Sequence, residues 1–214
     1  MIDEVKSKIL NLIDNNSYKN NNIIFSFSFL KNKNYCVLHI YNPDNEELII
    51  NEENEFNKDF YEKIASMLFV TDVDNKEKGC FNHQRSDDDI LYNKNVTLSE
   101  RLNSFLKIQY TFVLIELKNN QFSPVSLFCL VNNYIYDVCT SYYHRNKGHM
   151  TKLLLHFFKL VKQNKLKNGN HKTIQLDVVR QNPDFDAVQD YYEHKFGFDV
   201  LEILSDKIIM EKEI

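Results

Sequence analysis

The spacing of apolar residues in the first part of the chain predicts two helices separated by two strands. Residues 2–13 carry apolar side chains every three or four positions, which is typical of a short amphipathic helix. A polar, Asn-rich stretch follows at 15–22. Runs rich in Ile, Phe, Tyr and Val at 23–30 and 35–41 predict strands. Helical spacing returns at 56–69.

Further along, the pattern predicts one more helix and then three strands. Thr97 precedes a helical apolar stripe and Glu100 follows three residues later, as in a capping box. Apolar runs at 110–117, 125–131 and 134–140 are joined by short polar turns. Successive strands with short connections predict an antiparallel meander.

The last part of the chain mixes helices and strands. Helical periodicity predicts helices at 148–164 and near 185–195, and strands are predicted at 173–180, 198–204 and 207–212. Because helices and strands alternate here and the preceding meander is antiparallel, we expect an α/β domain built on a mixed sheet.

The length of 214 residues suits one domain, or one domain with an arm. We therefore predict an N-terminal helical arm at 1–22 and a single domain at 23–214. Residues 71–96 are polar and include three consecutive aspartates. Within the domain, this stretch predicts a long mobile loop.

Charge and hydropathy exclude some classes of partner. The net charge of -4 argues against nucleic acid, since phosphate binding needs a basic field. No apolar run approaches the roughly 20 residues of a membrane span, and the charged first residues lack the apolar core of a secretory signal. We expect a cytoplasmic protein that binds neither nucleic acid nor membrane.

The 4 cysteines form no C-x-x-C pair and predict free thiols in a reducing compartment. Cys80 and His83 have a spacing seen in metal sites. A structural zinc site needs about four ligands, and no second pair is visible, so we predict no metal. Cys139 lies on a predicted strand in apolar surroundings, which indicate a protonated core thiol and not a nucleophile.

The loop between the strand at 134–140 and the following helix has features of a phosphate site. The first amides of a helix lack internal partners and lie at its positive end. Gly148 lets the backbone approach a phosphate closely, and Arg145 and Lys147 add positive charge. The alternative is an ordinary helix N-terminus with a solvated basic turn.

The stretch from Ile135 to Met150 resembles the GNAT superfamily of N-acetyltransferases, whose signature runs from a strand through Q/R-x-x-G-x-G/A into a helix. Arg145 and Gly148 match this signature, whereas Met150 stands where the family usually has Gly or Ala. The resemblance covers roughly 110–214 well. It implies a mixed, mostly antiparallel twisted sheet, flanked by helices and splayed between its central strands.

The resemblance also implies acetyl-CoA as cosubstrate. Backbone groups of Val138, Cys139 and Thr140 would pair with the pantetheine arm like an added strand edge. Arg145 would add charge beside the pyrophosphate, and Asn182 would contact the cofactor. The amides expected to hold the pyrophosphate are those of Asn146, Lys147, Gly148, His149, Met150 and Thr151.

A carboxylate on the next strand is the candidate base. Leu176 and Val178 point one way in this strand, so Asp177 points the other way. An acidic residue at this position serves as general base in some family members, and an ammonium acceptor must lose a proton before attack. A solvated strand carboxylate is the alternative interpretation.

Residues 187–198 are similar to the family ending A-x-x-x-Y-x-K-x-G-F, with a longer spacing and two adjacent tyrosines. The family tyrosine protonates the leaving thiolate, which a phenol with pKa about 10 can do at neutral pH. We assign this role to Tyr192, with Tyr191 as the second choice. Alternatively, both rings simply pack against the sheet.

Two histidines of the predicted helix at 148–164 have no serine or cysteine partner in the pattern. We expect His149 to be exposed at the helix start and His156 to be partly solvated.

The predicted function is transfer of an acetyl group from acetyl-CoA to a primary amine, by direct attack in a ternary complex. The acceptor is a small molecule or a protein, the first half of the chain shapes its site, and the protein is a monomer or homodimer. The alternative is a catalytically weak or inactive coenzyme A-binding or interaction module.

Overall fold

The structure is a computed structural model that describes residues 22–31, 34–47, 49–50, 53–68, 97–119, 121–166 and 172–214, together with Ser7, Asn11 and Cys80. The helix predicted at 2–13 and the loop predicted at 71–96 therefore lie almost wholly outside the described residues. None of the described helices is long and apolar enough to cross a membrane.

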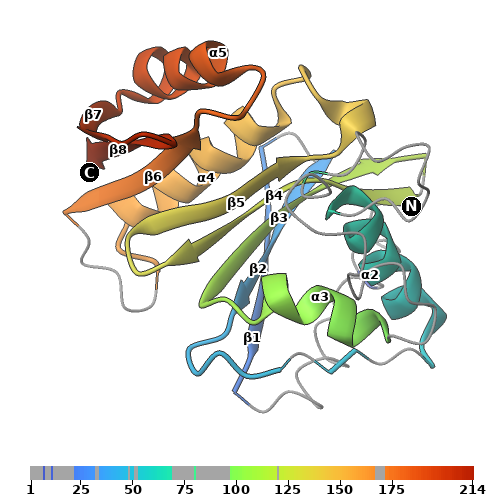
Figure 1. Cartoon of the computed structure of the whole chain (residues 1–214). Helices are drawn as coiled ribbons and strands as arrows, with labels where there is room; N and C mark the ends of the chain where they lie inside the picture. The colour runs from blue at the N-terminus through green and yellow to red at the C-terminus, as the bar shows by residue number, and fades with distance from the viewer. Residues whose placement is uncertain are drawn as a thin grey trace. The chain divides into compact units, whose positions relative to one another are not determined.

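The described elements follow the predicted order closely (Figure 1). The strands are β1 (Ile24–Phe29), β2 (Tyr35–Tyr41), β3 (Tyr110–Lys118), β4 (Gln121–Val131), β5 (Tyr134–Thr140), β6 (Thr173–Val179), β7 (Asp199–Ile203) and β8 (Lys207–Glu213). The helices are α2 (Glu55–Leu68), α3 (Leu98–Leu106), the 3-10 turn η4 (Tyr142–His144), α4 (His149–Lys162), α5 (Phe185–Asp190) and the π-helix η5 (Tyr191–Phe196).

The chain divides into two compact units. The first comprises Met1–Cys129 and Asp137–Leu154, and the second comprises Leu130–Tyr136 and Leu155–Ile214. The strands of the first unit follow the order β1-β2-β3-β4-β5, and those of the second follow β5-β6-β8-β7. β5 contributes to both units, as does α4.

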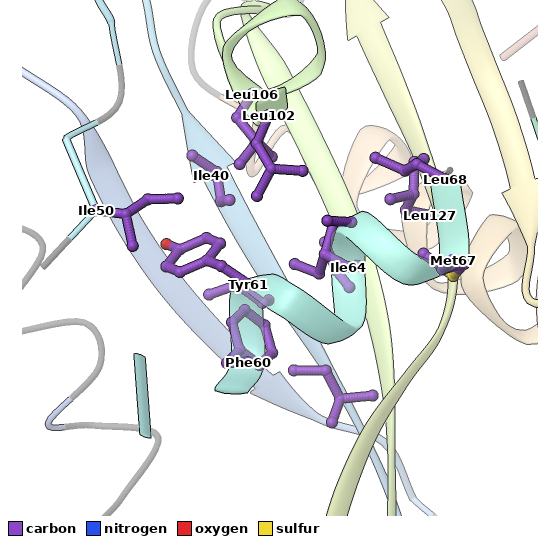
Figure 2. Close-up of a cluster of buried hydrophobic side chains, with 14 of the residues drawn as sticks. Ile40, Ile50, Phe60, Tyr61, Ile64, Met67, Leu68, Leu102, Leu106 and Leu127 are labelled. Carbon is purple, nitrogen blue, oxygen red and sulfur yellow. The ribbon is translucent and has the colours of Figure 1, made fainter. Parts of the chain in front are cut away.

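A hydrophobic core lies between the strands of the first unit and the helices α2 and α3 (Figure 2). Alternate strand residues such as Leu38, Ile40 and Ile115 point into it, because successive side chains of a strand face opposite sides. The helices contribute residues at i, i+3 and i+4 spacing, as predicted for amphipathic helices. These are Phe60, Tyr61, Ile64, Leu68, Leu98, Leu102 and Leu106.

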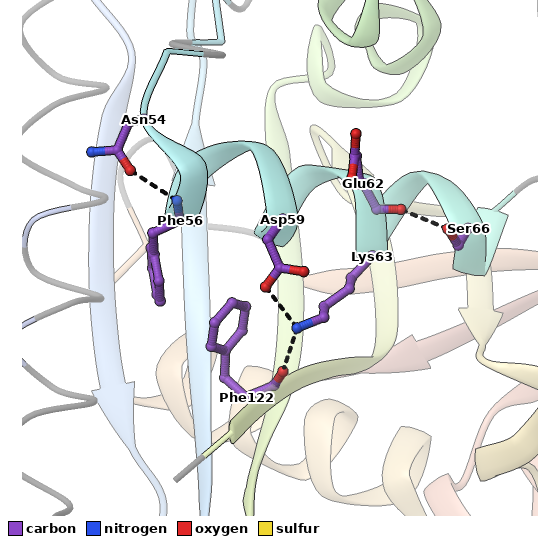
Figure 3. A network of polar contacts seen from close by, with 7 residues as sticks. All are labelled: Asn54, Phe56, Asp59, Glu62, Lys63, Ser66 and Phe122. Atoms are coloured by element: carbon purple, nitrogen blue, oxygen red, sulfur yellow. Dashed lines mark hydrogen bonds and ion pairs between the residues drawn. The ribbon is translucent and has the colours of Figure 1, made fainter.

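Polar contacts fix α2 at its start and along its outer face (Figure 3). The Asn54 side chain accepts hydrogen bonds from the amides of Phe56 and Asn57 at 3.0 and 3.2 Å, which satisfies two of the unpaired amides at the helix start. Lys63 pairs with Asp59 at 2.7 Å and lies 4.3 Å from the ring centroid of Phe122. This contact joins α2 to the start of β4.

The capping box predicted at the start of α3 is confirmed. The Thr97 hydroxyl accepts a hydrogen bond from the Glu100 amide, and the Glu100 carboxylate accepts one from the Thr97 amide at 2.7 Å. The backbone hydrogen bond from Thr97 lowers the pKa of Glu100, followed by the side-chain bond from the same residue. The motif therefore holds an ionised carboxylate at the positive end of α3.

The second unit has its own buried face. Ile174, Leu176 and Val178 of β6 are opposite Lys212, Met210 and Ile208 of β8. β6–β8 and β7–β8 are antiparallel, whereas β5 and β6 are parallel. Pairing between β5 and β6 is limited to Tyr134 with Gln175 and Ile135 with Leu176. The predicted mixed, mostly antiparallel sheet is confirmed.

Two predictions about local structure need correction. Cys80 and Cys139 form a disulfide, with Cα atoms 5.8 Å apart, so the prediction of four free thiols was wrong. Cys36 and Cys129 are not in a disulfide and are buried, and burial raises the pKa of both thiols. β4 begins at Gln121, four residues earlier than expected for the strand at 125–131, so Pro124 lies inside a strand.

Candidate functional site

The segment between β5 and α4 turns sharply through two left-handed residues. η4 ends at His144, and Asn146 and Gly148 then have φ values of 60° and 70°. Glycine adopts this conformation without steric cost. A Cβ atom placed on Gly148 would meet no atom of the described residues within 4 Å.

Amides at the start of α4 are available for a ligand. Before the turn, the amides of His144 and Arg145 donate to the carbonyls of Ser141 and Tyr142. Inside the helix, the Lys152 amide donates to the Gly148 carbonyl at 3.1 Å. Between these bonds, no partner among the described residues is assigned to the amides of Gly148, His149 and Met150. Such amides at a helix N-terminus attract anions.

Three basic residues lie close to these amides in the sequence, and each side chain donates to a backbone carbonyl of this segment. The Arg145 Nε donates to the Thr140 carbonyl at 3.4 Å, and its guanidinium lies 5.2 Å from the Tyr142 ring. Lys147 donates to the Tyr143 carbonyl at 2.7 Å, and Lys152 to the Lys147 carbonyl at 3.4 Å. Their charges add to the helix dipole at this end of α4.

The end of β5 carries the three residues whose backbone was expected to pair with a pantetheine arm. Val138 is exposed, Cys139 is buried in the disulfide with Cys80, and the Thr140 hydroxyl lies 2.9 Å from Ser126 Oγ. Asp137 has a φ of 52°, a left-handed conformation inside a strand. Such a residue locally interrupts regular pairing, in the part of β5 beyond its pairing with β6.

His149 does not lie where the sequence predicted. Only 3% of its surface is exposed, and neither ring nitrogen has a hydrogen-bond partner among the described residues. Its ring packs 5.6 Å from Tyr35 and 5.7 Å from His144. Burial lowers the pKa of His149, followed by the charge of Lys152. The prediction of an exposed side chain failed because β2 supplies a ring that covers the helix start.

In the second unit, Asp177 is half-buried and is paired with Lys207 at 2.9 Å. The hydrogen bond from Lys207 to this carboxylate raises the pKa of Lys207. Nearby, burial and then the Asp177 charge raise the pKa of Tyr134 to about 12. The predicted orientation of Asp177, away from buried Leu176 and Val178, is confirmed, and its carboxylate has an ion-pair partner that the sequence did not indicate.

The two tyrosines lie in the π-helix η5. A π-helix accommodates one extra residue per turn, which accounts for one of the two residues by which this stretch is longer than the family ending. η5 is followed by Gly197, which has a φ of 66°. Tyr192 is 5% exposed, and burial raises its pKa. Tyr191 is half-buried, and its ring packs edge-on against Tyr192 and Phe196.

Asn182 is exposed in the loop after β6. Its side chain accepts a hydrogen bond from the Asp184 amide at 3.0 Å, which shapes a local turn. Met150 and Thr151 are half-buried in the first turn of α4.

The predicted residues fall into two groups. Residues of β5 and the α4 start, from Val138 to Thr151, belong to the first unit, and Asp177, Asn182, Tyr191 and Tyr192 belong to the second. Sequence reasoning missed Tyr35, Glu116 and Lys152, which surround His149. No local pattern marks them, because β2, β3 and α4 bring them together from distant parts of the chain.

No protein-family model and no curated protein matches the sequence. Several solved structures match the fold. An acetyltransferase of the GNAT family from Listeria monocytogenes is 12% identical, covering 89% of this chain and 95% of that one, with a TM-score of 0.43. An aminoglycoside 6'-N-acetyltransferase complexed with coenzyme A is 12% identical, covering 76% and 93%, with a TM-score of 0.44.

Another match is a candidate streptothricin acetyltransferase from Bacillus anthracis, in complex with acetyl coenzyme A. It is 21% identical, with a TM-score of 0.35. The match covers 49% of this chain and 62% of that protein, less than two thirds of its length.

Proposed function

We propose that this chain is a GNAT-type N-acetyltransferase that transfers an acetyl group from acetyl-CoA to a primary amine. The observation that carries this proposal is the set of amides of Gly148, His149 and Met150, unpaired among the described residues, at the start of a 14-residue helix. Arg145, Lys147 and Lys152 lie within a few residues of them. Backbone donors and fixed positive charge together suit the pyrophosphate of coenzyme A.

The proposed residues have separate tasks. The amides after Asn146 bind the pyrophosphate, and the backbone of Val138, Cys139 and Thr140 pairs with the pantetheine arm. Asn182 adds a cofactor contact. The left-handed residue Asp137 and the end of β5–β6 pairing support this assignment, since they interrupt the ladder just before these strand residues.

Direct attack by the amine in a ternary complex needs one group to accept a proton and another to donate one. Asp177 is the proposed acceptor, and its carboxylate lies 2.9 Å from Lys207 Nζ. Tyr192 is the proposed donor to the leaving thiolate, with Tyr191 as the second choice. Burial raises the pKa of Tyr192, so its phenol is protonated throughout the neutral range.

The second candidate function is a coenzyme A-binding module with weak or no catalysis. Two observations favour it. Tyr192 is only 5% exposed, and the Asp177 carboxylate is already occupied by Lys207 at 2.9 Å. Both features reduce the access that a proton donor and acceptor need.

Two measurements test these functions in sequence. Calorimetry with acetyl-CoA should show binding, and thiol release should appear when a panel of primary amines is added. Binding without release across the whole panel would favour the module. Absence of both heat and thermal stabilisation at millimolar acetyl-CoA would reject the two functions together.

A further inference from the structure

A cluster of titratable side chains in the first unit adjoins the start of α4. The Tyr35 hydroxyl donates to the Glu116 carboxylate at 2.8 Å. His144 Nε2 lies 3.8 Å from the other oxygen of Glu116, and His149 packs against the rings of Tyr35 and His144. Lys152 lies 5.0 Å from the Tyr35 ring centroid. The cluster therefore joins β2, β3, η4 and α4.

His149 is the unusual member of this cluster. It is 3% exposed, yet neither of its ring nitrogens has a hydrogen-bond partner among the described residues. Buried polar groups are normally paired, because leaving them unpaired costs folding free energy. The backbone amide of the same residue is one of the three available to an anion. A charge bound at the start of α4 thus lies close to an imidazole shielded from solvent.

The surroundings of His149 disfavour a second positive charge. Lys152 on its own helix and His144 and Lys147 in the preceding segment oppose protonation, and Glu116 on β3 favours it. Tyr35 on β2 contributes a phenol whose pKa is raised to about 12 by burial, and then by its hydrogen bond to Glu116, so it stays neutral. Burial, the largest influence, keeps the pKa of His149 below its ordinary value of 6.5. The ring is therefore neutral at pH 7 in the free protein.

We infer that His149 binds a proton when a diphosphate ligand occupies the start of α4, so that this site holds its ligand more tightly as the pH falls. The inference rests on the proposed function, since coenzyme A supplies the diphosphate. The ligand brings negative charge next to a low-dielectric cluster whose positive charges otherwise oppose protonation. The same anion that pairs with the amides therefore stabilises an imidazolium beside them.

The direction follows from linkage. A group that is protonated more readily in the complex than in the free protein makes the affinity rise as the pH falls. The affinity rises only in the pH interval between the pKa of this group in the free protein and its pKa in the complex. For one proton, the affinity cannot rise by more than about tenfold per pH unit. Above this interval neither state binds the proton, and below it both do.

The test uses dephospho-CoA as ligand, because its diphosphate diester stays ionised between pH 5.5 and 8. The terminal phosphate of coenzyme A, by contrast, titrates near pH 6. We expect the dissociation constant of the unsubstituted protein to fall by roughly three- to tenfold from pH 8 to pH 5.5. In His149→Leu this dependence should largely disappear. The control His194→Gln removes an exposed histidine of the second unit and should keep the full dependence.

The unsubstituted protein also gives a readout that needs no variant. Calorimetry at pH 6 in two buffers of different ionisation enthalpy counts the protons taken up, and we expect a value between about 0.3 and 1. Measurable binding with no uptake, or a His149→Leu protein that keeps the pH dependence, would overturn the inference and leave the proposed function standing. No binding of dephospho-CoA or acetyl-CoA at any pH would remove both.

Discussion

Gly148 and Gly197 have the same left-handed backbone, with φ values of 70° and 66°, but different surroundings. At Gly197, which ends η5, the amide donates to Glu193 at 2.9 Å, and the following Phe198 amide donates to Tyr192 at 3.2 Å. At Gly148, which precedes α4, no partner among the described residues is assigned to the amide. The amide of Gly148 therefore has no partner among the described residues, whereas the amides at and after Gly197 donate to carbonyls of η5 and end that helix.

The comparison shows that a positive φ alone does not identify a functional turn. A helix C-terminus commonly ends with a left-handed glycine whose amide bonds back into the helix, which is the role of Gly197. The same conformation before a helix, with unpaired amides and basic neighbours, instead prepares an anion site. The hydrogen-bond partners of the neighbouring amides separate a structural turn from a binding one.

The largest expected effect concerns Tyr192, in the turn that ends at Gly197. If this region also carries the proton donor, Tyr192→Phe should lower turnover by roughly a hundredfold or more, with little change in the dissociation constant of acetyl-CoA. Steady-state rates and calorimetry check the two halves of this prediction. Tyr191→Phe is the matched control, because its ring is adjacent in the same π-helix.

The paired variants also distinguish the remaining possibilities. A large loss in Tyr191→Phe with an unchanged Tyr192→Phe would move the role to Tyr191. Unchanged turnover in both variants would mean that the turn at Gly197 has only a structural role. The two left-handed glycines would then differ fully, with only the turn at Gly148 serving the proposed function.

Gly148→Ala should weaken acetyl-CoA binding by roughly ten- to a hundredfold. The added Cβ meets no atom of the described residues and would project into the space where the proposed ligand binds, and the left-handed backbone disfavours alanine. Losing one or two hydrogen bonds to a charged group corresponds to this factor. Titration calorimetry measures the affinity, and circular dichroism confirms folding. An affinity within twofold of the unsubstituted protein would contradict the proposed role of this turn.

Gly197→Ala should lower stability and leave binding intact. The left-handed conformation costs alanine about 1 to 2 kcal/mol, which corresponds to a fall in melting temperature of about 2 to 8 °C for a chain of this size. Lys212 Nζ lies 3.5 Å from the position of the new Cβ, an ordinary contact, so no clash adds to this cost. Gly197→Asn is the control and should lose less, because asparagine tolerates this backbone.

Local sequence signals predicted the elements that depend on neighbouring residues. The capping box of Thr97 and Glu100 and the strand at 134–140 required only nearby positions, and both are confirmed. The π-helix η5 was partly visible in the sequence as the two extra residues between Ala187 and Gly197, although they did not reveal its geometry. The early start of β4 was missed because the apolar run at 125–131 begins only after Pro124. A proline cannot donate a strand hydrogen bond, so Pro124 indicates a strand boundary in the sequence pattern.

Features that depend on distant residues could not be predicted in this way. The Cys80–Cys139 disulfide joins positions separated by 59 residues. The burial of His149 depends on Tyr35, which β2 brings to the start of α4. The ion pair of Asp177 depends on the register between β6 and β8, which places Asp177 opposite Ile209 and Val179 opposite Lys207. A pattern of apolar positions fixes which face a residue occupies but not its partners on that face.

The smallest expected effect concerns this ion pair, whose carboxylate also helps to raise the pKa of Tyr192. Lys207→Met should lower stability at pH 7 by about 0.5 kcal/mol, because partly exposed pairs contribute little. The pKa of Lys207 is raised above its ordinary value of 10.5, so the contribution of its charge to stability is complete below pH 10.5 and is lost as the pH rises through the raised value.

Denaturant unfolding of the unsubstituted protein and Lys207→Met at pH 8 and at strongly alkaline pH should therefore show that the difference in their unfolding free energies shrinks as the pH rises. Lys195→Met, which changes an exposed lysine of η5, should show no such trend. A Lys207→Met deficit that stays constant with pH would mean that the Lys207 side chain stabilises the fold by packing and not by its charge.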